Sequence, residues 1–177
     1  MPVLTAGGSA LILIDFQARL MPAIHDGAAA LANARRLLAA ARLLDVPVTA
    51  TEQNPRGLGG TVPDLDLRPG EVRPKMTFDA GLAPGTLHDL SEDRTLVVAG
   101  CEAHVCVLQT VLGLLADGRR VAVVADAVGS RRPESRDAAL RRLDRHGAET
   151  VTTEMVLFEW LGGCEHPRFR DILALIR

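Results

Sequence analysis

The sequence predicts a three-layer α/β/α protein, in which helices cover both faces of a Rossmann-like, mostly parallel sheet of about six strands. Short apolar segments rich in Leu, Ile and Val recur along the chain, and stretches with helical periodicity separate them. This alternation is typical of a parallel sheet that is buried on both sides. Hydrophobic residues make up 47% of the chain and aromatic residues only 3%, so Ala, Val and Leu must build the core.

Four apolar segments predict buried strands, and two weaker segments complete the sheet. Each strong segment is short, continuous and bounded by turn residues, as expected for a strand covered on both faces. The strong segments are SALILID ending at Asp15, PVTAT ending at Thr51, TLVVAG ending at Gly100 and VAVVAD ending at Asp126, and the weaker ones lie around Val72 and at 150–152.

Three segments between these strands have the apolar spacing of helices. The first ends ahead of a proline, which disfavours helical geometry in the residue before it. The second ends at an Asp-Gly pair, and the third opens on a proline and closes before a glycine, as helix termini commonly do. These segments are 28–44, 105–116 and 133–146.

A chain of 177 residues can enclose one hydrophobic core, so we expect a single domain over 1–177. The irregular stretch 52–73 is rich in Gly, Pro and Asp, and long loops in compact α/β domains are often functional. In such sheets ligands bind beyond the carboxyl ends of the strands. We therefore expect the site at that edge, with 52–73 as one of its walls.

Composition and charge disfavour several classes of partner. The formal net charge is −2 and the pI is near 6.2, so no long-range field attracts phosphate backbones, and few rings are present for base stacking. We expect no nucleic-acid partner. No apolar run approaches the roughly 20 residues that cross a bilayer. The N-terminus lacks the features of a secretory signal, which predicts a cytoplasmic protein without a membrane partner.

The three cysteines show no CxxC pair and no metal-ligand spacing, which disfavours both a disulfide framework and a structural zinc site. In VVAGCEAHVCVLQ a buried strand passes through glycine into a helix, with Cys106 in the first helical turn. The helix dipole and unpaired N–H groups there would lower the pKa of this thiol and hold an oxyanion. The alternative is a buried small hydrophobe. Cys101 and Cys164 receive only structural interpretations, Cys101 at the end of a core strand and Cys164 in a loop after Gly162-Gly163.

Two charged residues are candidates to assist the thiol. Asp15 ends a wholly apolar strand at the same predicted edge, so it is either a proton acceptor in the site or a helix-capping acid. Lys75 follows a proline within RPKMTF and would stabilise a thiolate if it is held at the sheet edge. The alternative interpretation is that Lys75 is a solvated surface lysine.

Histidine is a weaker candidate for the base. His104 lies two residues before Cys106, and residues two apart on a helix do not face each other, so we interpret His104 as a pocket-lining or capping residue. In the run SRRPESRDAALRRLDRHG, acids are interleaved with arginines at helical spacing, which indicates a solvated, salt-bridged face. Arg131 is the exception: it lies after the VAVVAD strand and just ahead of Pro133, which makes it a candidate for the sheet edge.

Taken together, LILIDFQ, the lysine of RPK and GCEAHVCV, in this order, resemble the isochorismatase-like cysteine hydrolases. The resemblance covers nearly the whole chain, and TEQNPRGLGGTVPDL, DAVGSR and EHPRF are most similar to the isochorismatase domain-containing proteins. It implies an isochorismatase-like hydrolase fold and a catalytic triad of Asp15, Lys75 and Cys106. It also implies an oxyanion hole formed by the backbone N–H groups of Glu102 and Cys106, and a cis peptide between Cys101 and Glu102.

Nicotinamidases, which belong to the same superfamily, carry a metal-binding Asp-x-His pair after the second strand. This chain has Thr51, Glu52 and Gln53 there, and a carboxylate and an amide without histidine make a poor transition-metal site. We therefore expect no metal, no cofactor and no nicotinamidase activity.

The expected reaction is hydrolysis of a small amide-like or related carbonyl substrate through a thioester on Cys106. Phe16, Gln17, Gln53 and His104 are the predicted substrate-pocket residues. One alternative is the vinyl ether hydrolysis of true isochorismatases, which can lack the cysteine. Another is a non-catalytic binding protein that retains the fold.

A nucleotide-binding Rossmann protein shares this fold class. Its GxGxxG turn is missing here, because the first strand runs into DFQARLMP. The family analogy also implies a homo-oligomer, with the helical segment 136–145 or the LFEWLGG region as the contact surface.

Overall fold

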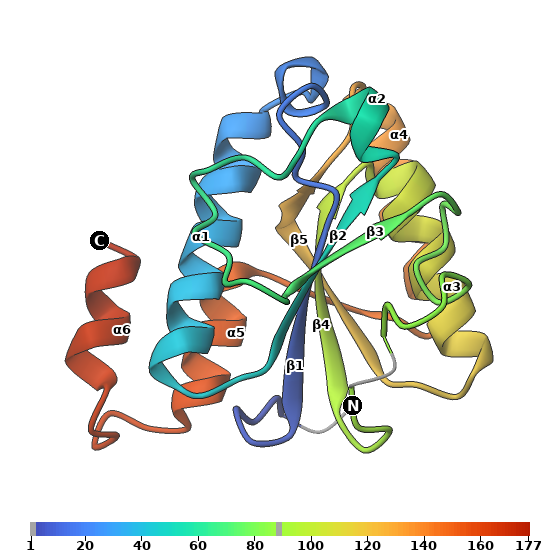
Figure 1. Ribbon diagram of the computed structural model, residues 1–177. Coiled ribbons are helices and arrows are strands. Elements are labelled where there is room, and N and C mark those ends of the chain that lie inside the picture. Colours follow the sequence, from blue (N-terminus) through green and yellow to red (C-terminus); the bar gives the residue numbers. More distant parts are fainter. Residues whose placement is uncertain (1–2, 88–89) are drawn as a thin grey trace.

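The sheet contains six strands, all parallel, in the order β3-β2-β1-β4-β5-β6. The computed structural model describes residues 3–87 and 90–177, and Figure 1 shows helices on both sides of the sheet. The predicted fold class and number of strands are confirmed. The strands are β1 (Ser9–Ile14), β2 (Val48–Gln53), β3 (Val72–Lys75), β4 (Thr95–Cys101), β5 (Val121–Gly129) and β6 (Glu149–Val151).

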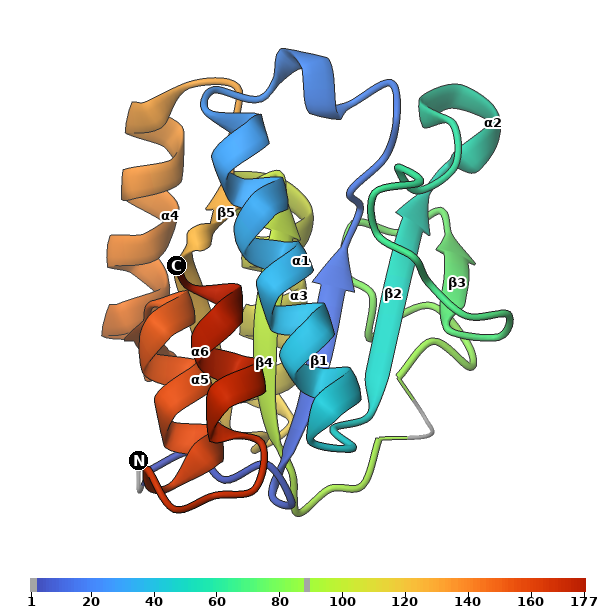
Figure 2. The same ribbon diagram turned by 90° about the vertical axis from the view of Figure 1, so that its left-hand side faces the viewer.

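The strand register brings segments that are distant in sequence to one edge of the sheet. Ile14 is paired with Gly100 of β4, so Asp15 follows directly at the carboxyl end of β1. Gln53 at the end of β2 is paired with Lys75 at the end of β3. In Figure 2 the arrowheads of β1, β2 and β3 lie at the upper edge of the sheet. The order β3-β2-β1-β4 therefore gathers these strand ends side by side.

Helices cover the two faces unequally (Figures 1 and 2). One face packs against α1 (Gly27–Leu43), α5 (Thr153–Leu161) and α6 (Phe169–Leu175), and the other against α3 (Leu108–Ala116) and α4 (Pro133–Arg145). A parallel connection needs a crossover of this kind, because the chain must return to the starting edge before the next strand begins.

Alternation along the strands divides the apolar side chains between two cores. In β1, Leu11 and Leu13 belong to the core under α1, whereas Ile12 and Ile14 belong to the core under α3. All four are buried, and each such side chain contributes about 2 kcal/mol through burial. Because both faces are covered, the strand has no polar face, which explains its continuous apolar sequence.

Several elements differ from the sequence-based expectation. The helix expected at 105–116 is preceded by a π-helical turn, Ala103–Val107, and β5 continues past Asp126 to Gly129. Helices α5, α6 and the short α2 (Pro55–Leu58), together with the 3-10 turn Met21–Ala23, have no counterpart among the predicted elements. In α5 the strand-favouring residues Val, Phe and Trp weaken the helical signal, and packing on the sheet determines the structure instead.

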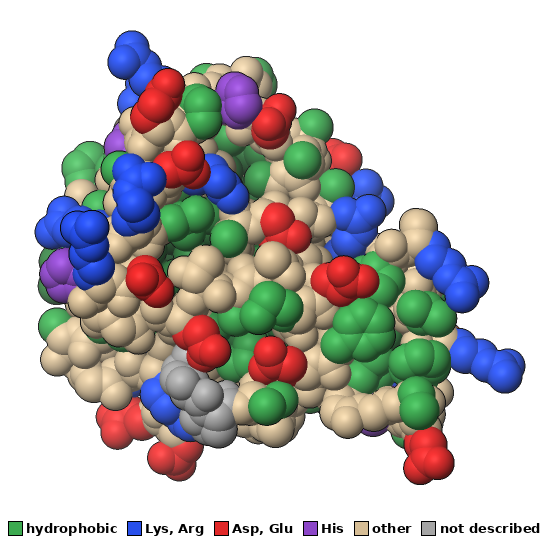
Figure 3. Space-filling model, turned by 180° about the vertical axis from the view of Figure 1, so that it is seen from behind, with side chains coloured by type: hydrophobic (Ala, Val, Ile, Leu, Met, Phe, Trp, Pro, Cys, Tyr) green, Lys and Arg blue, Asp and Glu red, His purple; other side chains and the backbone are tan. Residues whose placement is uncertain are grey.

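Charges of both signs occur on the face of the molecule that Figure 3 draws. On the face drawn in Figure 3, acidic, basic and apolar side chains are interspersed, in keeping with the net charge of −2. Within 3–87 and 90–177, no helix combines the length and the apolar character that crossing a bilayer requires.

Candidate active site

Asp15 lies at the carboxyl end of β1 and is fully buried. Its φ of 54° is in the left-handed region, which turns the chain away from the strand direction after Ile14. Oδ1 accepts a hydrogen bond of 2.6 Å from the Thr51 hydroxyl, and Oδ2 accepts one of 2.8 Å from the Lys75 ammonium. Asp15 therefore contacts another candidate site residue and is not a helix cap.

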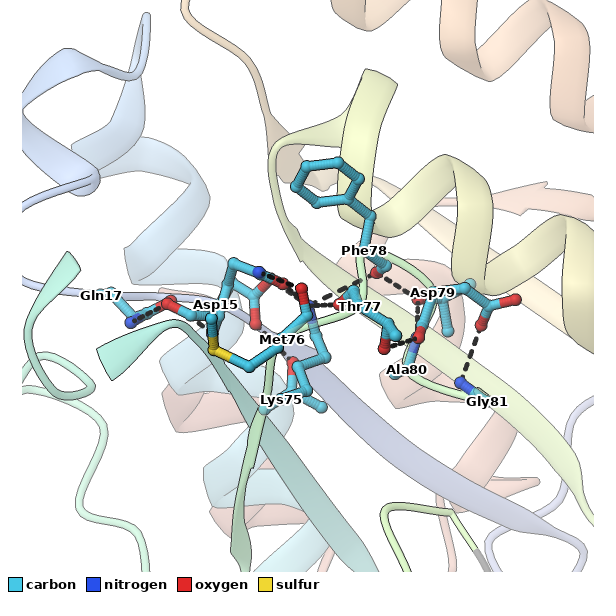
Figure 4. Close-up of polar contacts among 12 residues, drawn as sticks. Asp15, Gln17, Lys75, Met76, Thr77, Phe78, Asp79, Ala80 and Gly81 are labelled. Atoms are coloured by element: carbon cyan, nitrogen blue, oxygen red, sulfur yellow. Dashed lines mark hydrogen bonds and ion pairs between the residues drawn. The ribbon is translucent and has the colours of Figure 1, made fainter. Parts of the chain in front are cut away.

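The Lys75 ammonium is surrounded by oxygen atoms at the end of β3. Nζ lies 2.8 Å from Asp15 Oδ2 and 2.8 Å from Gln53 Oε1, and 3.3 and 3.4 Å from the carbonyl oxygens of Thr77 and Phe78. The side chains of Asp15 and Lys75 are both 0% exposed, so the interpretation of Lys75 as a surface lysine is wrong. Figure 4 shows the segment after Lys75 around the ammonium, with the Phe78 ring directed away from it. These contacts offset the desolvation cost of the buried ion pair.

Cys106 reaches the same ion pair from the π-helical turn after β4, and it is only 6% exposed. Its thiol forms side-chain hydrogen bonds with Asp15 and with Lys75. The three residues of the predicted triad therefore meet at one point, although they come from β1, β3 and the turn after β4. Their catalytic roles stay predictions.

Burial raises the pKa of the Cys106 thiol to about 12, and the charge of Asp15 and its hydrogen bond add to the increase. The charge and hydrogen bond of Lys75 lower this pKa, but they do not offset burial and Asp15. The expectation that the helix N-terminus lowers the pKa is therefore wrong, because desolvation disfavours the thiolate more than the dipole favours it. At neutral pH Cys106 is a thiol beside a carboxylate that can accept its proton.

Glu102 connects the turn after β4 with the end of β5. Its Oε2 accepts a hydrogen bond of 3.0 Å from the Arg131 backbone N–H and one of 2.9 Å from Arg131 Nε. Arg131 thus lies at the sheet edge, as its place after the strand predicts. The peptide bond between Cys101 and Glu102 is cis, as the resemblance implies. The N–H groups of Glu102 and Cys106 remain the predicted oxyanion donors.

The four predicted pocket residues occupy different places. Phe16 is buried in the core under α1. Gln17 and Gln53 bond to each other, because Gln53 N–H donates to Gln17 Oε1 at 2.8 Å and Gln17 Nε2 donates to the Gln53 carbonyl at 3.0 Å. His104 is half-buried, and its Nδ1 lies 3.0 Å from the Ser130 hydroxyl. Of the four, Gln53 is the one whose side chain contacts a residue of the triad.

Two threonines near the triad are not identified by the sequence analysis. Thr51 donates to Asp15, and Thr110, which is 0% exposed, accepts a hydrogen bond of 3.0 Å from the Ala80 N–H. A usable signal exists for each: Thr51 ends the strand beside that of Asp15, and Thr110 lies four residues after Cys106 on the same helix face.

The irregular stretch 52–73 contacts this region mainly through its first residues. The Gly59 carbonyl accepts a hydrogen bond of 2.6 Å from Gln17. Glu52 Oε1 accepts hydrogen bonds of 2.6 and 2.8 Å from the N–H and hydroxyl of Thr61. Glu52 and Gln53, which stand where nicotinamidases have metal ligands, are therefore engaged by other groups of the chain. Among the residues of 3–87 and 90–177, no cluster of His, Cys, Asp and Glu has the arrangement of a metal site.

Two cavities are lined by residues of the candidate site or of the stretch 52–73. One of about 700 Å³ is lined by Lys75 together with residues of α2 and of 82–84. The other, of about 670 Å³, lies between α1 and 64–69. The far part of 52–73 therefore lines a cavity of its own rather than the surroundings of Cys106.

Comparison with known proteins identifies the relatives of this chain. A family model described as the isochorismatase domain matches residues 9–155. Isochorismatase domain-containing protein 1 from Salmo salar is 41% identical over 166 residues, which cover 92% of this chain and 59% of that protein. This chain therefore spans only about three fifths of the length of that relative.

Solved structures show the same fold. The MAR1 ribonuclease from Caenorhabditis elegans has a TM-score of 0.92 and 35% identity, with 98% of this chain and 91% of that chain covered. YcaC from Pseudomonas aeruginosa, solved with hexane-2,5-diol and covalent acrylamide, has a TM-score of 0.87 and 27% identity, with coverage of 98% and 91%.

Proposed function

Since this chain belongs to the isochorismatase family, we propose that it is a cysteine hydrolase acting on a small amide-like carbonyl substrate. Membership of the family supports a hydrolase, and the nucleophile, the intermediate and the substrate class are the proposal. One observation carries it: the Cys106 thiol is hydrogen-bonded to Asp15 and Lys75, a fully buried acid–base pair at the carboxyl edge of the sheet.

In the first half of the reaction, Cys106 Sγ attacks the substrate carbonyl carbon while its proton moves to Asp15. The carbonyl oxygen becomes an oxyanion, which the backbone N–H groups of Glu102 and Cys106 would bind. As the proton moves, the negative charge passes from Asp15 through sulfur to the carbonyl oxygen, and the Lys75 ammonium stabilises it while it develops on sulfur. The C–N bond then breaks, and the leaving amine takes the proton from Asp15, which leaves a thioester on Cys106.

In the second half, water restores the enzyme. Asp15 accepts a proton from water as the oxygen attacks the thioester carbon. Collapse of this second tetrahedral intermediate breaks the C–S bond and releases the carboxylic acid. The sulfur of Cys106 recovers its proton from Asp15, so that acid, base and nucleophile return to their starting states.

A relative supports a reactive nucleophile in this fold. The YcaC protein from Pseudomonas aeruginosa was solved with covalent acrylamide, a small amide with an electrophilic double bond. Acrylamide is therefore a suitable probe for Cys106. We expect a single adduct on Cys106 in addition to labelling of the exposed Cys164.

The decisive experiment is a hydrolysis screen with matched cysteine variants. Primary amides, N-carbamoyl amino acids, vinyl ethers and an RNA oligonucleotide are offered to the wild type, to Cys106→Ala and to Cys164→Ala. We expect turnover of an amide or carbamoyl compound that Cys164→Ala keeps and that Cys106→Ala loses by at least about 1000-fold. Amide turnover that Cys106→Ala retains would rule out the thioester route.

The other substrates in the screen test the alternatives. RNA is included because one relative is a ribonuclease, although the net charge of −2 and the 3% aromatic content of this chain disfavour RNA binding. Vinyl ether turnover that survives Cys106→Ala would support the isochorismatase-type reaction instead. The proposed route uses no metal or cofactor, so dialysis against EDTA should leave amide turnover unchanged.

A further inference from the structure

The ammonium of Lys75 depends on the short segment that follows it. The carbonyl oxygens of Thr77 and Phe78 lie 3.3 and 3.4 Å from Nζ, and they complete the oxygen shell formed by Asp15 and Gln53. The position of this segment, residues 77–81, therefore helps to determine the position of the ammonium.

This segment has internal hydrogen bonds. The Thr77 hydroxyl donates to the Asp79 carbonyl at 2.7 Å, and the Gly81 N–H donates to Asp79 Oδ1 at 2.7 Å. Figure 4 shows both bonds, with the Asp79 carboxylate on the side of the segment opposite the Lys75 ammonium. Two side-chain hydrogen bonds therefore stabilise the conformation of this turn.

Thr110 of α3 attaches the turn to the helix that follows Cys106. Its side chain is 0% exposed. Oγ1 accepts a hydrogen bond of 3.0 Å from the Ala80 N–H and lies 3.5 Å from the Phe78 carbonyl oxygen, the same oxygen that contacts Lys75 Nζ. Thr110 lies four residues after Cys106, so both side chains are on one helix face.

A second contact between the turn and α3 is independent of Thr110. The Asp79 carboxylate lies against Gly113, where an added Cβ would be 2.3 Å from Oδ2. Only a residue without a side chain leaves room for this carboxylate in its present position. The Asp79 side chain thus packs against α3, next to the hydrogen bonds that Thr110 forms with the turn.

From these contacts we propose that Thr110 is a positioning residue, which holds the turn at 77–81 so that the Lys75 ammonium stays aligned with the Cys106 thiol. The inference rests on the proposed function, because it assigns a role within that reaction. Thr110 acts through the turn: its hydroxyl accepts a hydrogen bond from the Ala80 N–H and lies beside the Phe78 carbonyl, and the Phe78 carbonyl contacts Lys75.

The first test measures acrylamide labelling of Cys106 by peptide mass spectrometry at pH 8.5, which needs no known substrate. In Thr110→Val the turn loosens and Lys75 stabilises the thiolate less, so we expect labelling of Cys106 to be about fivefold to tenfold slower. Thr110→Ser retains the hydroxyl and should restore the wild-type rate. Thr95→Val, which alters another buried threonine at the opposite end of β4, should label at the wild-type rate.

The sign of the effect separates positioning from loss of structure. A purely structural defect in Thr110→Val would expose the buried thiol and accelerate labelling of Cys106, which would overturn the proposal, as would an unchanged rate. Slower labelling with a wild-type thermal transition supports it. If Thr110→Val does not fold, Thr110→Ala takes its place, because it also removes the hydroxyl that accepts from the Ala80 N–H. Slower labelling of Cys106 in Thr110→Ala, with the wild-type rate in Thr110→Ser, supports the proposal, and an unchanged rate in Thr110→Ala overturns it.

Hydrolysis is measured separately once a substrate is found. We expect Thr110→Val to lower kcat by about tenfold with little change in KM, because the pairing of Lys75 with sulfur matters in the transition state. A change in KM alone would contradict a positioning role. If no substrate is turned over by the wild type while the labelling result holds, the hydrolase proposal fails and the positioning role of Thr110 stands.

Discussion

At the scale of single residues, the neutral state of the Cys106 thiol determines how it can act as a nucleophile. With the pKa raised to about 12 by burial and by Asp15, only about one thiol in 100,000 is ionised at pH 7. A preformed thiolate is therefore a minor species. Attack on a substrate must be coupled to transfer of the thiol proton, and Asp15 is the acceptor already in contact with it.

This state predicts the order in which the cysteines react. Iodoacetamide at pH 7 should label the exposed Cys164 first, while Cys106 reacts slowly. Below its pKa the thiolate fraction of Cys106 increases tenfold per pH unit, so its labelling rate should rise about tenfold per unit between pH 7 and pH 10. Peptide mass spectrometry of a time course measures both rates. A rate at Cys106 that levels off below pH 9 would contradict the raised pKa.

The sequence predicts which residues form the triad but not the electrostatic state of the thiol. Asp15, Lys75 and Cys106 are predicted together because their motifs resemble those of a family and because parallel strands end at one edge. The sign of the pKa change follows from the 6% exposure of Cys106 and from its contact with Asp15. The sequence indicates that Cys106 lies at the start of a helix, but it gives neither the exposure of the thiol nor its contact with Asp15.

At the scale of elements, the close approach of β1 and β4 places Asp15 beside the turn that contains Cys106. Gly100, the residue paired with Ile14, has a φ of 150°. A Cβ at Gly100 would lie 2.3 Å from the Ile14 carbonyl oxygen, far inside van der Waals contact. The two strands can therefore end side by side only because this residue is glycine.

Gly100→Ala should destabilise the protein by about 3 kcal/mol or more, because it adds a backbone collision to an unfavourable φ. Urea unfolding measures the loss, and labelling of Cys106 measures any displacement of the site. The matched control is Gly7→Ala, since an added Cβ at Gly7 meets no atom within 4 Å and should change the unfolding free energy by less than about 0.5 kcal/mol. Equal unfolding free energies for Gly100→Ala and the wild type would refute this steric account.

Element by element, the sequence predicts strands better than short helices. The apolar segment of β4 is buried at every position, so its sequence alone identifies it. Helix α5 is only nine residues long and half polar on its exposed side, and its Trp and Val residues favour strands by propensity. Its helical state depends on packing under α1, a long-range contact that no local pattern reports. The extension of β5 to Gly129 likewise follows from pairing with Cys101 in β4.

At the scale of the whole molecule, the two cores contain one buried thiol each. Cys101 belongs to the core under α1 and Cys106 to the core under α3. Burial raises the pKa of Cys101, like that of Cys106, to about 12. Few other side chains titrate in this range, because the chain contains no tyrosine and Lys75 is its only lysine. The alkaline limit of stability should therefore depend on these two thiols.

Both thiols have a folded-state pKa of about 12, above the ordinary value of 9.0. Their contribution to stability is complete below pH 9 and is lost as the pH rises toward 12, because the unfolded chain releases protons that the folded chain retains. Each thiol can remove up to about 1.4 kcal/mol per pH unit in this range.

We therefore expect the unfolding free energy of the wild type to fall steeply between pH 9 and pH 10.5. Cys101→Ala should be less stable at pH 8, where it leaves a cavity, yet lose distinctly less stability over the same interval, whereas Cys164→Ala retains both buried thiols and should follow the wild type. Urea unfolding at each pH gives the three slopes, and identical slopes for Cys101→Ala and the wild type would show that thiol ionisation does not limit stability at high pH.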